Sequence, residues 1–252
     1  MKLLLLIYLL IYSAGIYSDC VPNNNFPLRT LCLDSVSIYL DNFLTKAEVE
    51  KKSPQQQVRE HGVGGFPYRE FTSPYGPPYS SMYSPKQIGE KVTIQATYLK
   101  ADDKTSNLAA FGSPSGILVV LNPENVSAEN TDLVEVTGKI ELYKPHLYGD
   151  ELGIRVEDAK LLFTPKQKES FFKTGKNFLI KLRKSYKDYF QCFRNDSFPT
   201  SAELLLWDNQ NKEIVFPIFT GKGRITSKFY LVLDPERNKI TKLYGSCTIY
   251  YD

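Results

Sequence analysis

The sequence predicts a mainly β protein built from two small units: a five-stranded barrel over about 86–165, then one helix packed on a curved antiparallel sheet over 166–252. Residues 86–165 contain five short stretches in which apolar and polar residues alternate, and a period of two is typical of strands that bury one face. Residues 166–193 instead repeat apolar residues three and four apart, as a helix does, and strand-like runs follow them. The chain is therefore assigned to the β and α+β classes.

The first eighteen residues have the composition of a secretory signal peptide. One lysine precedes an apolar run from Leu3 to Tyr12, and small residues follow at 13–15. This run is too short to span a bilayer, and no basic stop-transfer flank follows it. We expect cleavage near Gly15 or Ser18, a secreted or extracellular protein, and no membrane span afterwards. An apolar first strand, or a wrongly assigned start codon, is the alternative.

The cysteine content agrees with secretion. The chain has four cysteines, an even number that favours pairing in an oxidising compartment. Of the three possible connectivities we prefer Cys20 with Cys32 and Cys192 with Cys247. No CxxC motif occurs, so the cysteine spacing predicts no metal site.

Two Asn-X-Ser sequons fit the same interpretation. They begin at Asn125 and Asn195 and predict N-glycosylation of a secreted protein. A three-residue pattern is common by chance, so the sequons agree with secretion without proving it.

Residues 19–85 are expected to hold one helix and then a segment of low order. Between Leu33 and Leu44 apolar residues recur three and four apart, which predicts an amphipathic helix over 31–49. The later stretch 66–85 is rich in Pro, Tyr and Phe, and repeated Pro excludes both a helix and regular strand pairing. It is predicted to be a linker or extended arm, whose aromatic residues either lie on their own domain or stack on a partner.

The barrel strands are predicted at 90–100, 107–112, 116–122, 132–142 and 153–163. The GSPSG sequence at 112–116 predicts a tight turn between the second and third strands. Gly138 inside the fourth strand, and a slip of phase near Glu157 or Asp158 in the fifth, indicate bends and bulges of the kind that close small barrels. Nine residues are predicted to point inward: Val92, Ile94, Val119, Val134, Val136, Ile140, Ile154, Val156 and Leu161.

The C-terminal unit is predicted to begin with a long helix over 166–193, with Gly175 as the place where it would be interrupted. Strands are expected at 202–207, 213–219, 224–233 and 239–251. The turn-type residues at 234–238 should join the last two strands into a long hairpin.

The middle of the chain resembles a known family. SPKQIGEKVTIQATYLK, GILVVLNPENVSAENTDLVEVTGKIEL and GIRVEDAKLLF are similar to the replication protein A small subunit over about residues 82–165, a third of the chain. The resemblance implies an OB-fold barrel, and a scaffold role in a single-stranded-DNA-binding assembly for replication or repair in the nucleus. It also implies a protein partner held through the helix after the barrel, unless that helix belongs to the next domain. The signal-like N-terminus and the additional C-terminal unit depart from this family.

The C-terminal unit resembles the NTF2-like domains of nematode secreted proteins. KSYKDYFQCFRNDSF, followed by an antiparallel sheet ending in YGSC, has their order. This resemblance implies a cone that presents aromatic residues, Trp207 among them, to an apolar ligand, although these aromatics are first expected to be core and edge residues.

Charge separates the two units. Residues 82–165 carry eight Lys and Arg and twelve Asp and Glu, a net of −4, whereas 166–252 carry sixteen and nine, a net of +7. An acidic barrel suits a phosphate backbone poorly, so we expect a scaffold role for it and at most indirect contact with nucleic acid. Contact with nucleic acid or a partner is predicted for seven basic residues: Lys176, Lys181, Arg183, Lys184 and Lys187 on the helix, and Lys222 and Arg224 in the GKGR turn. The alternative is that these residues form a solvated basic face.

No catalytic pattern is recognisable in the sequence. Nucleotide-binding glycine motifs are missing, and the two histidines, His61 and His146, lie in loop-like sequence. We expect a protein that is not an enzyme and that has no cofactor or metal. Two function classes remain: a nuclear OB-fold assembly subunit, and a secreted, disulfide-bonded binding protein that recognises a protein or a small apolar ligand.

Overall fold

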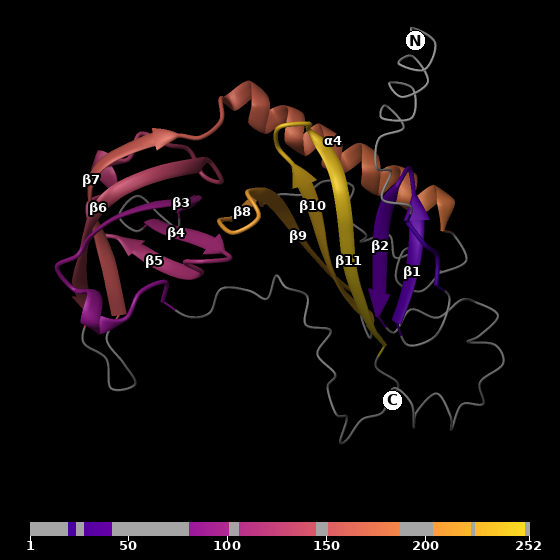
Figure 1. Ribbon diagram of the computed structural model, residues 1–252, viewed down its shortest axis with the longest axis horizontal. Coiled ribbons are helices and arrows are strands. Elements are labelled where there is room, and N and C mark those ends of the chain that lie inside the picture. The colour runs from indigo at the N-terminus through magenta and orange to yellow at the C-terminus, as the bar shows by residue number, and fades with distance from the viewer. Residues whose placement is uncertain are drawn as a thin grey trace, which may run out of the picture.

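The chain folds into one continuous sheet, one end of which closes into a barrel (Figure 1). In this computed structural model the described residues are 20–23, 28–41, 81–100, 106–144, 151–186, 204–222 and 225–249. The predicted signal segment therefore lies outside the described residues, as do 42–80. Within the described ranges the sheet has eleven strands.

Five strands in the middle of the chain form the barrel: β3 (Lys91–Lys100), β4 (Ser106–Phe111), β5 (Gly116–Val120), β6 (Leu133–Lys144) and β7 (Glu151–Leu161). Strand β3 pairs with β4 and β6, β4 with β5, and β6 with β7, all antiparallel. A parallel pairing of β5 with β7 closes the ring. Two short 3-10 helices, η1 (Pro85–Gln87) and η2 (Pro123–Asn125), accompany the strands. The predicted OB-like barrel is thus confirmed.

The bend in the barrel lies where the sequence predicts it. Thr137 is opposite Asp158 and Gly138 is opposite Val156, so Glu157 is the extra residue of a bulge in β7. A Cβ atom on Gly138 would lie 2.4 Å from the carbonyl oxygen of Arg155. The two strands therefore approach too closely at this point for any side chain larger than hydrogen.

Most of the predicted inward residues line the barrel core. Val92 is partly buried against this core, and six others are buried in it: Ile94, Val134, Val136, Ile140, Ile154 and Val156. The prediction is wrong for two residues. In β5 the buried side chains are Leu118 and Val120, and Val119 points outward. The unbroken apolar run 117–121 leaves the phase of the strand ambiguous. Leu161 is 40% exposed, because β7 ends there at the rim of the barrel.

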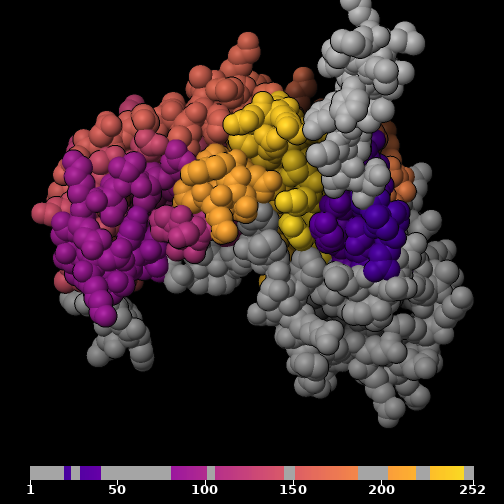
Figure 2. Space-filling model, in the orientation of Figure 1, coloured from indigo at the N-terminus to yellow at the C-terminus, as the bar shows by residue number. Residues whose placement is uncertain are grey.

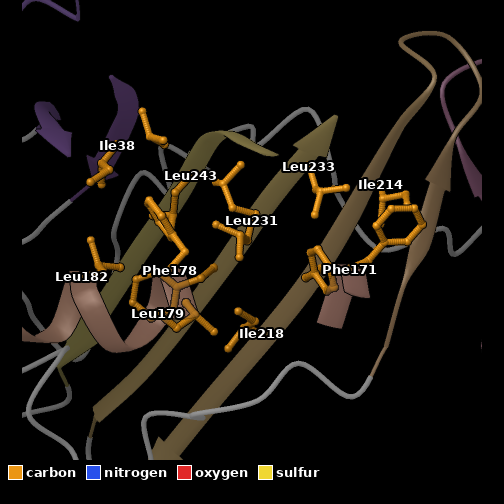
Figure 3. Packing of buried hydrophobic residues seen from close by; sticks show 14 of the residues in the cluster. Ile38, Phe171, Phe178, Leu179, Leu182, Ile214, Ile218, Leu231, Leu233 and Leu243 are labelled. Atoms are coloured by element: carbon orange, nitrogen blue, oxygen red, sulfur yellow. The ribbon is translucent and has the colours of Figure 1, made fainter. Parts of the chain in front are cut away.

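The second unit is a curved sheet covered on one face by a helix. Its strands follow the order β1-β2-β11-β10-β9-β8, and all pairs are antiparallel except β2 with β11. Figure 3 shows apolar side chains of the helix pointing toward those of the sheet. The predicted helix on an antiparallel sheet is confirmed at this level. The elements are α4 (Pro165–Ser185), β1 (Leu28–Leu33), β2 (Val36–Asp41), β8 (Leu206–Asp208), β9 (Glu213–Lys222), β10 (Ile225–Asp234) and β11 (Lys239–Ile249).

Helix α4 begins with a capping box. The hydroxyl of Thr164 accepts a hydrogen bond from the Gln167 N–H, and the Gln167 side chain accepts one from the Thr164 N–H. Gly175 does not interrupt the helix. A Cβ atom there would lie 3.5 Å from Cζ of Phe216, so the glycine lies directly over the ring in the core. The helix ends at Ser185 with Tyr186 as its C-cap, before the predicted end at 193, and residues 187–193 lie outside the described residues. No helix within the described ranges is long and apolar enough to cross a membrane.

The helix predicted over 31–49 is wrong as far as the structure describes it, because 28–41 form the β1–β2 hairpin. Asp34 and Ser35 make its two-residue turn with φ angles of 50° and 67°, as in a type I′ hairpin. The apolar positions fit both periods, and alternation places five of them in the core: Leu31, Leu33, Val36, Ile38 and Leu40. Residues 42–49 lie outside the described residues.

Candidate functional site

The outer face of β4 is covered by the second unit. In OB-like barrels the face of the second and third strands, here β4 and β5, is a common surface for binding oligonucleotides and oligosaccharides. Ala109 and Phe111 on this face are only 1% and 4% exposed. They belong to a cluster completed by four residues of the second unit: Leu206, Val215, Tyr230 and Val232. The β4 half of the common ligand surface is therefore occupied from within the chain.

Backbone pairing fixes this junction. Strand β8 pairs in parallel with the end of β4, Ala110 opposite Trp207 and Phe111 opposite Asp208. The Trp207 N–H donates to Oγ1 of Thr97 at 3.0 Å, and the Asn209 N–H donates to the carbonyl oxygen of Phe111 at 3.0 Å. Figure 2 shows the orange segment that contains β8 directly against the barrel. The two units consequently form one continuous body.

The GSPSG sequence serves the junction as well as the turn. Gly112 has a φ of +81°, and a Cβ atom there would lie 2.6 Å from the Gln210 nitrogen and 2.8 Å from Oδ1 of Asp208. Asp208 in turn accepts hydrogen bonds from the Gln210 and Asn211 N–H groups. Only glycine permits this approach of the two units.

The solvent-facing side of α4 carries a line of lysines. The helix contains six Lys and one Arg but only one Glu. Its apolar face is buried against the sheet, so the positions half a turn away point outward. We define the basic stripe as four exposed residues on this outward side: Lys166, Lys173, Lys176 and Lys184. None of them forms an ion pair with a carboxylate of the described residues.

Two other lysines of α4 are paired. Nζ of Lys168 lies 2.7 Å from Oδ1 of Asp132 in the barrel. Lys181 forms an ion pair with Asp34 in the β1–β2 turn. These two pairs link the helix to the barrel and to the β1–β2 turn. The buried apolar face of α4 sets its rotation about its axis, so the stripe faces outward.

The predicted contact residues therefore separate into groups. Lys176 and Lys184 lie on the basic stripe, whereas Lys181 pairs with Asp34 and Arg183 is half-buried. Lys222 ends β9, and its side chain is not described. Lys187 and Arg224 lie outside the described residues. Sequence reasoning missed Lys166 and Lys173, although their spacing of seven residues places both on one side of a helix.

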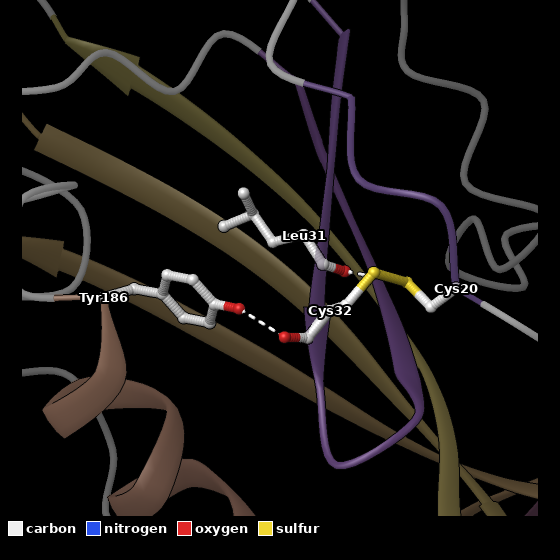
Figure 4. The surroundings of a disulfide bond; sticks show 4 residues. All are labelled: Cys20, Leu31, Cys32 and Tyr186. Carbon is white, nitrogen blue, oxygen red and sulfur yellow. Dashed lines mark hydrogen bonds between the residues drawn. A yellow bond between two sulfur atoms is a disulfide. The ribbon is translucent and has the colours of Figure 1, made fainter.

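The disulfide Cys20–Cys32 is confirmed, with a Cα–Cα distance of 5.7 Å. Cys32 lies in β1, which is an edge strand of the sheet. Figure 4 shows its bridge to Cys20. Along the open side of β1, the N–H and carbonyl groups of Thr30 exchange hydrogen bonds with those of Asn23 at 2.7 and 2.8 Å. The hydroxyl of Tyr186 donates to the carbonyl oxygen of Cys32 at 2.7 Å. The bridge thus holds residues 20–23 as a cover on the sheet edge.

Replacing both Cys20 and Cys32 by serine is expected to lower the free energy of unfolding by about 3 kcal/mol, from the loop entropy of a bridge across twelve residues. Hydrogen exchange at the Thr30 amide should accelerate in the variant, because Asn23 is no longer held against it. Val21→Ala, at an exposed position beside Cys20, is the matched control and should change neither quantity. Unchanged protection of Thr30 in the double variant would contradict this role.

Other predicted residues are only partly covered by the structure. Cys192, Asn195, His61 and His146 lie outside the described residues. Cys247 lies in β11, and its side chain is not described, so the bridge to Cys192 stays a prediction. No group of three His, Cys, Asp or Glu side chains that could hold a metal ion occurs among the residues with described positions.

The sequon at Asn125 lies in η2 at the surface. The Asn125 side-chain amide donates to the carbonyl oxygen of Val156 at 3.2 Å. The neighbouring Asn122 is buried and exchanges hydrogen bonds with the backbone of Val156 at 2.8 and 2.7 Å. Glycosylation of Asn125 stays a prediction.

The sheet face opposite α4 carries a row of aromatic residues. Tyr39 stacks on Tyr244 with ring centroids 5.2 Å apart, and Tyr230 is the next cross-strand neighbour. Burial raises the pKa of Tyr244, with smaller contributions from Tyr39 and Glu213. Phe219 meets Tyr230 edge to face at 6.1 Å. Tyr230 belongs to the cluster that holds the barrel and Tyr244 packs against it, whereas Phe219 is 56% exposed.

Trp207 belongs to the core, as the sequence first suggested. Its side chain is 4% exposed and lies 6.0 Å from the ring of Phe163. The space between α4 and the sheet is occupied here by packed side chains.

Comparison with known proteins identifies no family. No family model matches this sequence, and no curated protein matches it. Among solved structures, OBody AM3L15 bound to hen egg-white lysozyme is 14% identical with a TM-score of 0.26, and the match covers 33% of this chain and 85% of that chain. Asparaginyl-tRNA synthetase from Pyrococcus horikoshii complexed with asparaginyl-adenylate is 14% identical with a TM-score of 0.23, covering 62% and 53%. Matches with these TM-scores carry no argument about this chain.

Proposed function

We propose that this protein is a non-catalytic, secreted binding protein in which the OB-like barrel is a scaffold. The observation that carries the proposal is the covered face of β4. Ala109 and Phe111 point toward the second unit, so a nucleic acid cannot lie across the strands as it does on many OB-like barrels. Recognition then falls to surfaces outside the barrel.

Secretion is supported by the Cys20–Cys32 bridge. Structural disulfides form and persist in oxidising compartments and are rare in the nucleus. The signal-like residues 1–18 and the sequon at Asn125 agree with this location.

A macromolecule is a better partner for this fold than a small apolar ligand. The proposed likeness of 166–252 to NTF2-like domains is supported by the packing of α4 on a curved, mainly antiparallel sheet. A ligand-binding cone, however, needs an open space between the helix and the sheet. Within the described residues, four buried side chains of α4 occupy the space between them: Phe171, Phe178, Leu179 and Leu182 (Figure 3). A partner is therefore expected on the outer surface.

The second candidate function is an assembly subunit like that of replication protein A. It is supported by the OB-like barrel and by the helix that directly follows it. The apolar face of α4 is nevertheless packed on the sheet of the second unit, so this helix belongs to that unit. Helix packing against another subunit would have to use the lysine-rich side of α4, because the apolar side is already buried. A charged helix face packs poorly on another helix, so the secreted binding protein is the preferred function.

Intact mass of the full chain expressed without tags in cultured animal cells separates the two functions. We expect the protein in the medium, without its signal segment, with Cys20 and Cys32 joined in one unreduced peptide and with glycan on the sequons. Recovery from the nucleus with the complete N-terminus, and with both thiols open to alkylation, would overturn the secretory proposal and favour the assembly subunit.

A further inference from the structure

We propose that the basic stripe of α4 binds a sulfated polysaccharide. This inference rests on the proposed function, because sulfated glycans are met by proteins of the secretory pathway and cell surface. The residues that contact the polysaccharide are Lys166, Lys173, Lys176 and Lys184.

The dimensions of the stripe suit a linear polyanion. With a rise of 1.5 Å per residue, Lys166 and Lys173 are separated by about 10 Å along the helix axis, and Lys166 and Lys184 by about 27 Å. A row of point charges over this length can meet successive sulfates of one extended chain. Clusters of basic residues of this kind are known as patches for heparin or nucleic acid.

Charge distribution concentrates this attraction on α4. The barrel over 82–165 has a net charge of −4, so a polyanion is repelled there, whereas the helix has seven basic residues against Glu169. Lys168 and Lys181 are neutralised by Asp132 and Asp34, and the stripe lysines have no such partner among the described carboxylates. Their charges are therefore available to a ligand.

The helix presents these lysines on a rigid base. Phe171, Phe178 and Leu182 are at most 8% exposed in the core beneath it, so the helix is anchored on the sheet by buried side chains along its length. A rigid array loses less conformational freedom on binding than lysines on a loop.

Nucleic acid and lipid fit the stripe less well. Single-strand binding surfaces stack bases on aromatic rings placed between the basic residues. In α4 the rings of Phe171 and Phe178 point into the core, and Phe172 packs on Phe216. Membrane-surface helices insert an apolar face into the lipid. The apolar face of α4 is buried against the sheet, and Ile180 is the one large apolar side chain that this helix exposes.

The test uses the secreted full chain and immobilised heparin. The triple variant Lys166→Gln/Lys173→Gln/Lys184→Gln should bind about 100-fold more weakly than the unchanged protein, taking about fivefold for each lysine beside an anionic surface. The heparin affinity of the triple variant should also fall less steeply as the salt concentration rises. The control Lys86→Gln/Lys139→Gln/Lys144→Gln removes the same charge from exposed barrel positions and should bind as the unchanged protein does.

Four results would overturn the proposal: no heparin binding by the unchanged protein, equal loss in both triple variants, equal binding to desulfated heparin, or stronger competition by a single-stranded oligonucleotide or by anionic vesicles of equal charge. Secretion and the Cys20–Cys32 bridge are measured on the same sample. A secreted, bridged protein that ignores heparin therefore refutes the partner while leaving the proposed function standing.

Discussion

Replacing Phe111 by alanine is expected to lower the free energy of unfolding by about 3–5 kcal/mol. The side chain is 4% exposed and fills the space between the barrel and the second sheet. Its backbone pairs with Asp208, and its carbonyl oxygen accepts the Asn209 N–H, so the junction cannot simply close around the cavity. Urea unfolding followed by the fluorescence of Trp207, the sole tryptophan, measures the effect.

The matched control is Ile117→Ala on β5. Ile117 lies on the same outer face of the barrel, one strand away from β4, but is 39% exposed. It should cost about 1 kcal/mol or less, since little buried surface is lost. Equal effects of the two substitutions would mean that the second unit does not pack on the barrel, and the main support for a scaffold role would be lost.

The barrel was predictable because its signals are local. Gly138 and the phase slip at Glu157 lie within single strands, and the turn glycines Gly112 and Gly116 both adopt positive φ angles. Each of these bulges and turns can be recognised from a few adjacent residues in the sequence. Val119 shows the limit, because a run of apolar residues carries no phase.

The β1–β2 hairpin was missed because its sequence fits two periods. Leu33, Val36 and Leu40 are spaced as on a helix, yet Leu33 and Val36 also flank a two-residue turn without glycine. The deciding interaction is the parallel pairing of β2 with β11, about two hundred residues further along the chain. Strand preference depends on such neighbours, and a local pattern does not contain them.

The junction and the basic stripe were accessible only in part for the same reason. Strand β8 has three residues, and nothing in them indicates a parallel partner in β4. Sequence identified the lysine-rich helix but not its partners in space, Asp34 and Asp132, which remove Lys181 and Lys168 from the stripe.

Phe216→Ala should have an effect of similar size to Phe111→Ala, about 3–5 kcal/mol, but on the other side of the sheet. Phe216 is 0% exposed, lies beneath Gly175 of α4 and has its ring centroid 6.0 Å from that of Phe172. Its loss opens a cavity under the helix that displays the basic stripe. Thermal unfolding followed by circular dichroism, together with hydrogen exchange in α4, measures the change.

Phe219→Ala is the control from the same strand. Phe219 lies on the opposite face of β9 and is 56% exposed, so the same truncation should cost about 1 kcal/mol or less. Faster exchange in α4 is expected for Phe216→Ala alone. If both substitutions loosen the helix equally, then Phe216 does not seat α4 on the sheet, and the rigid presentation of Lys166, Lys173 and Lys184 loses its structural basis.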